Sequence, residues 1–142
     1  MGEVDRYLDT SFLVALLTHE PSSPRAEEFA RENSASLSVS DFAAAEFASM
    51  VSRRVRMREF TREQGRFALA TLDDWLRAVR WVELSPVDIA LATTFLRRLD
   101  LTLRTPDAIH IAIARRLGAT LVTFDRRMAA AAGALGAAVA EP

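Results

Sequence analysis

The 142-residue sequence contains no cysteine, and this absence removes several kinds of chemistry. A chain without cysteine has no disulfide bonds, no thiolate-bound metal and no cysteine nucleophile. All 18 basic residues are arginine, so lysine is absent as well. The missing lysine excludes a Walker-type phosphate-binding lysine, a Schiff base and a lysine general base. Much of the range of enzyme chemistry is thereby closed to this chain.

The sequence also lacks an excess of charge of one sign and any long hydrophobic run. Its 18 basic residues nearly balance 19 acidic ones, so any contact with nucleic acid must be local. No apolar stretch reaches the roughly 18 residues of a membrane span. Residues 1–11 lack the basic and apolar regions of a signal peptide. We therefore expect a cytoplasmic protein with no membrane partner.

The overall composition is that of an ordinary globular domain, with 50% hydrophobic residues, five glycines and five prolines. A chain of this length buries about two-thirds of its unfolded surface, which supports a core without disulfides. No internal repeat or long linker interrupts the chain, and alanine-rich residues 129–140 favour a packed terminal helix. We expect a single domain that spans residues 1–142.

Short strand-like segments alternate with longer helical segments along the chain. The pattern predicts four strands and a weak fifth, at residues 4–8, 36–39, 81–84, 120–123 and 137–140. Amphipathic helical patterns lie between them, at residues 12–17, 26–33, 41–58, 61–79, 85–99 and 108–117, with a further helix after residue 125. This order predicts an α/β fold with a central parallel sheet of four to five short strands and helices on both faces.

The predicted helices have recognisable first residues. Ser40 and Thr61 are suitable N-caps, and Pro106 stands at the first position of the helix that continues to Leu117. That helix is apolar on almost every side, which indicates a buried helix, and Gly118 ends it. The segment is therefore expected in the core.

Acidic residues stand directly after predicted strands, where parallel sheets bind their ligands. Asp9 follows the first strand and Asp125 follows the fourth, while Glu46 and Asp107 lie near the starts of two helices. All four side chains can converge on one pocket, where each carboxylate would raise the pKa of its neighbours. A divalent cation removes this conflict. Oxygen ligands without cysteine favour Mg²⁺ or Mn²⁺ over Zn²⁺.

Four short motifs contain these acids in a fixed order: Asp-Thr-Ser at 9–11, Ser-Asp-Phe-Ala-Ala-Ala-Glu-Phe at 40–47, Arg-Thr-Pro-Asp-Ala-Ile-His-Ile-Ala at 104–112 and Thr-Phe-Asp at 123–125. The first and last motifs are weak alone, but four in this order are strong together. They resemble the PIN-domain ribonucleases, most closely the VapC-like toxin subunits of VapBC toxin–antitoxin systems. The resemblance covers residues 4 to about 140 and implies a PIN-like fold.

The resemblance implies a Mg²⁺- or Mn²⁺-dependent endoribonuclease that hydrolyses RNA and leaves 5′-phosphates. It implies a homodimer and a VapB-like antitoxin as partners. Asp9, Glu46, Asp107 and Asp125 match the catalytic acidic quartet of the family. We expect Asp9 and Asp107 to bind the metal directly, and Asp125 to bind it directly or through water. Glu46 is expected to orient or deprotonate the attacking water.

Two further residues are assigned through the same resemblance, and a third, Arg104, through its position in the chain. Ser11 and Thr123 match the small hydroxyl positions near the metal, where they would hold a carboxylate rotamer or a metal-bound water. Arg104, three residues before Asp107, could hold an RNA phosphate, and a surface-loop arginine is an equally good interpretation.

Each acid also has a simpler interpretation. Asp9, Asp107 and Asp125 could all be helix-capping residues, whereas Glu46 lies among apolar residues, where an unpaired carboxylate is costly. His110, one turn after Asp107, could reach the pocket as a substrate contact or as a partner for a carboxylate, but a hydrogen-bonded core residue outside the site is the preferred interpretation. Other acidic residues, including Asp41 and Asp88, are expected to be surface or capping acids, and the arginines at 53–58 are explained by a solvated helix end at least as well as by RNA binding.

Two other classes of function share some of these sequence features. Haloacid-dehalogenase-like phosphatases and receiver domains also place an aspartate after the first strand, but both require a lysine that this chain lacks. A catalytically silent PIN-like module that binds RNA or protein is the remaining alternative. The position of Glu46 in an apolar segment favours an active enzyme over that module.

Overall fold

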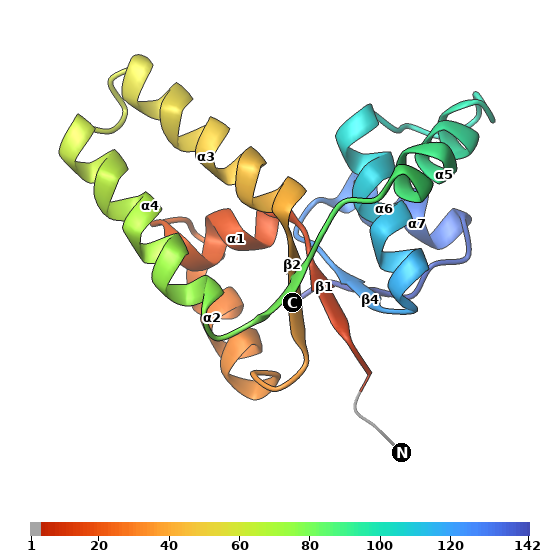
Figure 1. Cartoon of the computed structure of the whole chain (residues 1–142), viewed down its shortest axis with the longest axis horizontal. Coiled ribbons are helices and arrows are strands. Elements are labelled where there is room, and N and C mark those ends of the chain that lie inside the picture. Colours follow the sequence, from red (N-terminus) through yellow and green to blue (C-terminus); the bar gives the residue numbers. More distant parts are fainter. Residues whose placement is uncertain (1–3) are drawn as a thin grey trace.

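A five-stranded parallel sheet forms the centre of the molecule in the computed structural model, which describes residues 4–142 (Figure 1). Residues 1–3, part of the segment compared with a signal peptide, lie outside the described residues. The strands are β1 (Arg6–Leu8), β2 (Leu37–Ser40), β3 (Arg80–Val82), β4 (Thr120–Val122) and β5 (Val139–Ala140). Their order is β3-β2-β1-β4-β5, and every neighbouring pair is parallel. The predicted α/β class is confirmed.

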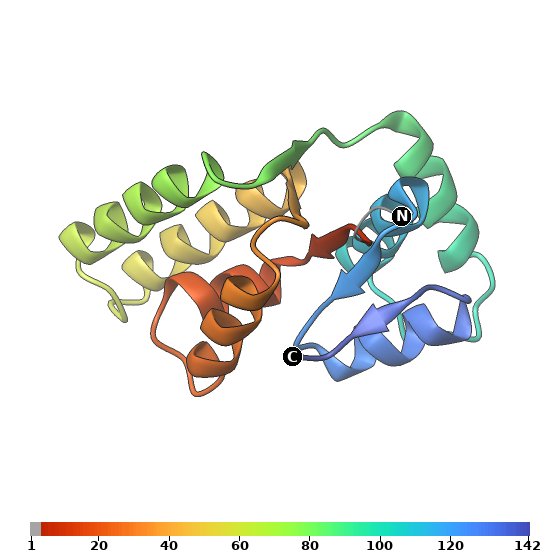
Figure 2. The ribbon, with the colours of Figure 1, turned by 90° about the horizontal axis from the view of Figure 1, so that it is seen from below.

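Seven helices cover the two faces of the sheet in the described part of the chain. One face packs against α1 (Thr10–Leu17), α2 (Ser23–Glu32), α3 (Asp41–Arg56) and α4 (Arg62–Leu76). The other face packs against α5 (Pro86–Leu96), α6 (Thr105–Leu117) and α7 (Arg126–Ala134). Figure 2, seen from below, shows the strands between these two groups of helices.

The alternation of side chains along the short strands creates two hydrophobic cores. Tyr7 and Leu121 belong to the core beneath α5, α6 and α7, whereas Leu8 and Val122 belong to the core beneath α1 to α4. The prediction of a buried helix before Gly118 is confirmed, because α6 is buried continuously over 107–114.

The direction of the chain along the sheet changes between β1 and β4. From β1 the chain passes through α1 and α2 to β2 on one side, and it later returns through α5 and α6 to β4 on the other. In open parallel sheets, ligands bind beyond the carboxyl ends of the strands at such a switch point. Asp9 and Thr123 are the first residues after these two strands.

Several local predictions need correction. Asp88, predicted to be a surface or capping acid, does cap α5 by accepting a hydrogen bond from the Ser85 amide, but it is fully buried and not at the surface. Residues 61–79, predicted as one amphipathic helix, form the shorter α4, which packs through Ala68 and Leu72 and leaves Phe67 74% exposed. The third strand ends at Val82, two residues early, since the Leu84 amide donates to Asp41 instead of a neighbouring strand.

No helix of residues 4–142 is long and apolar enough to cross a membrane.

Candidate active site

Asp9 is buried at the end of β1, with only 1% of its surface exposed. It caps α1, since Oδ1 accepts a hydrogen bond from the Phe12 amide at 3.0 Å. Ser11 Oγ donates to Oδ1 at 2.7 Å, and Thr123 Oγ1 donates to Oδ2 at 2.6 Å. Burial raises the pKa of Asp9, and the opposing effects of His110 and of these donors do not cancel the rise. No arginine of the described residues forms an ion pair with this carboxylate.

The two hydroxyls that hold Asp9 also connect it to the end of β4. Thr123 Oγ1 accepts a hydrogen bond from the Asp125 amide at 2.9 Å, and Ser11 Oγ accepts one from the Phe124 amide at 3.0 Å. The register that pairs Leu8 with Val122 brings these groups together. The Ser11 and Thr123 hydroxyls therefore hold the Asp9 carboxylate in one rotamer.

Asp107 and Asp125 line a common cavity of about 340 Å³ next to this network. Asp125 caps α7 through Oδ1, which accepts from the backbone amides of the first helical turn, and Asp107 Oδ2 accepts from the Arg104 amide at 3.1 Å. The second carboxylate oxygen of each residue accepts no hydrogen bond from the described part of the chain. The other lining residues are Thr102, Arg104, Arg126 and Arg127.

Arg104 also lines this cavity. Its side chain is 84% exposed, and Nε stands 3.9 Å from Asp107 Oδ2. A guanidinium that is so exposed gains little from this ion pair. It is therefore available for an external anion.

Glu46 projects from α3 toward Thr10 and His110. Thr10 Oγ1 donates to Oε1 at 2.6 Å, and His110 Nε2 donates to the same oxygen at 2.5 Å. Burial raises the pKa of Glu46, but the hydrogen bonds from His110 and Thr10 and the charge of Arg104 outweigh it, so the pKa is lowered overall. Oε2 accepts no hydrogen bond within residues 4–142. Glu46 is therefore held as a carboxylate with one oxygen available.

His110 was expected to be a bonded core residue outside the site, and it is indeed only 1% exposed. Its hydrogen bond to Glu46 nevertheless makes it a partner for a carboxylate, the alternative that its place one turn after Asp107 had indicated and that was not preferred. Its partner lies 64 positions away along the chain, so local spacing did not reveal it.

A second cavity, of about 360 Å³, is lined in part by Glu46. The arginines at 53–58, which were expected to lie at a solvated helix end, differ in their relation to this cavity. Arg53 and Arg56 line the cavity, whereas Arg54 turns away to Glu20, with an N–O distance of 2.8 Å. The remaining lining residues are Thr10, Ser11, Val14, Ser49 and Met50.

The donor groups at the strand ends fit a hard divalent cation. No three His, Asp or Glu side chains of residues 4–142 are gathered closely enough to hold an ion by themselves. Mg²⁺ is commonly held by only one or two carboxylates and completes its shell with water and substrate oxygens. Asp9 is buried without a positive partner, and Asp107 and Asp125 each present an unbonded oxygen. These are the ligands that such a cation needs.

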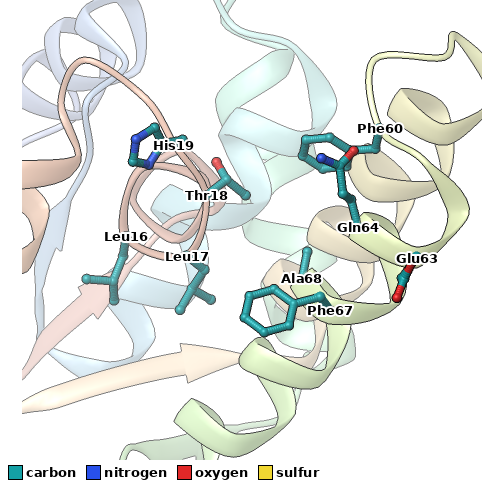
Figure 3. Close-up of a pocket in the computed structure, with 9 residues that line it drawn as sticks. All are labelled: Leu16, Leu17, Thr18, His19, Phe60, Glu63, Gln64, Phe67 and Ala68. Atoms are coloured by element: carbon teal, nitrogen blue, oxygen red, sulfur yellow. The ribbon is translucent and has the colours of Figure 1, made fainter.

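A separate, mainly apolar cavity of about 540 Å³ lies between the end of α1 and the start of α4 (Figure 3). It contains none of the four acids discussed above. The lining residues are Leu16, Leu17, Thr18, His19, Phe60, Glu63, Gln64, Phe67 and Ala68. Its composition is suited to a hydrophobic partner rather than to a phosphate group.

Comparison with known proteins agrees with this geometry. The family model of the PIN domain matches residues 6–134. The chain is 37% identical over 139 residues to Ribonuclease VapC46 of Mycobacterium tuberculosis, covering 96% of each chain. The crystal structure of VapC20 from Mycobacterium tuberculosis, a sarcin–ricin loop cleaving toxin, superimposes with a TM-score of 0.73 at 22% identity, covering 89% of this chain and 95% of the other. DNA-bound VapBC from Salmonella typhimurium gives a TM-score of 0.76 at 14% identity, covering 98% of each chain. This chain belongs to the PIN-domain family, as a VapC-like member.

Proposed function

We propose that this protein is a Mg²⁺- or Mn²⁺-dependent endoribonuclease and the toxin of a toxin–antitoxin pair. Residues 1–142 would act as one PIN domain, in the cytoplasm, where RNA is translated. The observation that carries the proposal is the buried Asp9 carboxylate, which has hydrogen-bond donors but no cation within the described chain. The relative named Ribonuclease VapC46 supports the choice of reaction.

In this proposal the four acids have two roles: the three aspartates bind the cation, and Glu46 accepts a proton. Asp9 and Asp107 hold the cation directly, and Asp125 holds it directly or through water. When bound, the cation polarises the phosphodiester and lowers the pKa of the attacking water. Glu46 Oε2 accepts the proton of that water, since Oε1 is already bonded to Thr10 and His110. Attack on phosphorus breaks the bond to the 3′ oxygen, so the product carries a 5′-phosphate.

The proposed RNA contacts lie on both sides of these acids. Arg104 stands at the cavity of Asp107 and Asp125, whereas Arg53 and Arg56 line the cavity of Glu46. Guanidinium groups bind phosphate oxygens well because their donors match the geometry of the phosphate. A single RNA strand could therefore be held before and after the bond that is cut.

The proposed protein partners are a VapB-like antitoxin and a second copy of this chain. Structural neighbours include VapBC from Rickettsia felis and FitAB, each bound to a DNA fragment. Exposed Phe67 and the apolar cavity beside it offer surface that a partner helix can cover. Size-exclusion chromatography with and without the protein encoded by the neighbouring gene tests both assemblies.

Cleavage of a total-RNA pool by purified, antitoxin-free protein tests the proposed reaction. Wild type and Asp107→Asn are compared with Mn²⁺, with Mg²⁺ and with EDTA, and the new RNA ends are mapped. We expect discrete, metal-dependent cuts that leave 5′-phosphates and disappear in the variant. No cleavage by folded wild-type protein with either metal would overturn the enzyme and favour a silent binding module.

A further inference from the structure

We propose that His110 is a positioning residue for Glu46 and that Tyr7 holds His110 in the required state. The inference rests on the proposed ribonuclease function and assigns a role to groups outside the acidic quartet. A continuous set of hydrogen bonds from β1, β2 and α6 ends on the carboxylate that would receive the proton of the attacking water.

The contacts form a continuous chain of hydrogen bonds through the interior, and Thr10 Oγ1 joins it at Glu46, 3.2 Å from His110 Nε2. His110 Nε2 donates to Glu46 Oε1 at 2.5 Å, and its other ring nitrogen, Nδ1, lies 2.7 Å from the Tyr7 hydroxyl. The Tyr7 hydroxyl in turn lies 2.7 Å from Ser40 Oγ, which accepts a hydrogen bond from the Ala43 amide at 3.0 Å. Strand β1, the cap of α3 and the core of α6 thus meet at one imidazole.

Counting donors and acceptors fixes the direction of these bonds. An ionised Glu46 only accepts, so the hydrogen of a neutral imidazole must be on Nε2. Nδ1 is then an acceptor, and the Tyr7 hydroxyl donates to it while accepting from the Ser40 hydroxyl. With a neutral imidazole, every polar group in this chain of hydrogen bonds has a partner. Tyr7 therefore selects the tautomer that donates to Glu46.

The buried His110 ring restricts the Glu46 side chain, which is itself partly exposed and flexible. The Glu46 side chain is 28% exposed and has three rotatable bonds, whereas the His110 side chain is only 2% exposed. Phe42 packs against the imidazole with ring centroids 5.1 Å apart, which limits rotation of the ring. Because two donors occupy Oε1, the unbonded Oε2 is left to act as the base.

A pair of amide variants separates this role from a purely structural one. The amide nitrogen of glutamine reaches the position of Nε2, whereas that of asparagine reaches only the position of Nδ1. We expect His110→Gln to retain most of the wild-type kcat for RNA cleavage. His110→Asn should lose about 10- to 100-fold in kcat with KM unchanged, as is usual for residues that orient a ligand or base. Thermal unfolding midpoints of both variants are measured alongside.

A double-mutant cycle with Glu46 supplies a second test. Once Glu46→Ala has removed the carboxylate, His110→Asn should cause no further loss of residual kcat, because nothing is left to position. Additive losses, or losses in both His110 variants that follow their thermal midpoints, would overturn the inference and leave His110 as a core residue only.

A spectroscopic measurement tests the same geometry without catalysis. In ¹⁵N-labelled protein, the ring nitrogens of His110 should show a protonated Nε2 and an unprotonated Nδ1, and Tyr7→Phe should alter this distribution. Exposed His19 is the internal control. A protonated Nδ1 in the neutral ring would overturn the inference alone. Absence of RNA cleavage by wild type would overturn the proposed function, and the positioning role with it.

Discussion

Two aspartates of this fold are equally buried, yet their surroundings differ in one respect. Asp88, at the start of α5, is 0% exposed, and Asp9, at the start of α1, is 1% exposed. Both cap a helix. Asp88 also accepts two hydrogen bonds from Arg116, at 2.7 and 3.0 Å, whereas Asp9 receives only hydroxyl and amide donors.

The difference shows where the chain compensates a charge and where it does not. The hydrogen bond to Asp88 raises the pKa of Arg116, which keeps this pair ionised. Burial raises the pKa of Asp9 instead, and neither His110 nor the hydroxyl and amide donors to Asp9 cancel this rise. A buried ion pair that the chain completes by itself is part of the scaffold. A buried carboxylate without an ion-pair partner is where we propose that an external cation binds.

The largest effect is expected from removal of the Asp9 charge. Asp9→Asn should lower metal-dependent RNA cleavage by about a thousandfold or more, equivalent to several kcal/mol of transition-state stabilisation. The fold should persist, because a buried amide costs less than a buried charge. Asp88→Asn is the matched control and should keep its specific activity in the folded state. Equal losses of activity in both variants would remove the distinction between the two aspartates.

Removal of the Asp88 side chain is expected to affect the stability of the fold and not its activity. Asp88→Ala should lower the free energy of unfolding by about 3 kcal/mol, since it leaves Arg116 without its buried partner. This is the lower end of the usual range, because the Arg116 side chain is 31% exposed and can reach water. Urea unfolding measures the change. A loss below about 1 kcal/mol, the size of an ordinary surface pair, would contradict the scaffold role.

A smaller effect is expected from the hydroxyl that holds Asp9. Thr123→Val preserves the shape of the side chain but removes the donor to Asp9 Oδ2 and the acceptor for the Asp125 amide. Affinity for Mn²⁺ should fall about 10- to 100-fold, as measured by isothermal titration calorimetry. Thr120→Val, in the same strand and away from these contacts, should leave the affinity unchanged. Unaltered Mn²⁺ affinity in Thr123→Val would show that this hydroxyl does not orient a ligand.

The smallest effect is expected from the metal itself on the stability of wild type. At ten times its dissociation constant, Mn²⁺ should stabilise the folded state by about 1.4 kcal/mol. For a chain of this size, that raises the thermal midpoint by about 3–6 °C. The shift should vanish with EDTA and in Asp9→Asn, but persist in Asp88→Asn. A shift in Asp9→Asn as large as in wild type would place the cation elsewhere.

Much of the fold could be predicted from the sequence because its signals are local. Ser40, and Thr61 with Gln64, cap their helices as expected, and the apolar segment before Gly118 forms buried α6. The helix and strand periods predicted the α/β order and placed four acids near the strand ends. The roles assigned to those acids remain a proposal, which the variants above test.

The partners of each side chain could not be predicted in the same way. Asp9 and Asp88 look alike in the sequence, and Arg116 lies 28 positions beyond Asp88. Thr123 meets Asp9 across 114 positions, and His110 meets Glu46 across 64. Phe67 and Leu72 belong to one apolar stripe, but only the packing of α4 decides that Phe67 is exposed.

The sequence by itself determined the helices, the strands, the acids at the strand ends and the resemblance to PIN-domain ribonucleases. These properties depend on residue spacing within one or two turns and on the order of motifs. Only the tertiary structure decided which buried aspartate has a cation of its own and which histidine holds the glutamate. Strand order and register bring those groups together across the sheet, and neither is encoded in any single stretch of the chain.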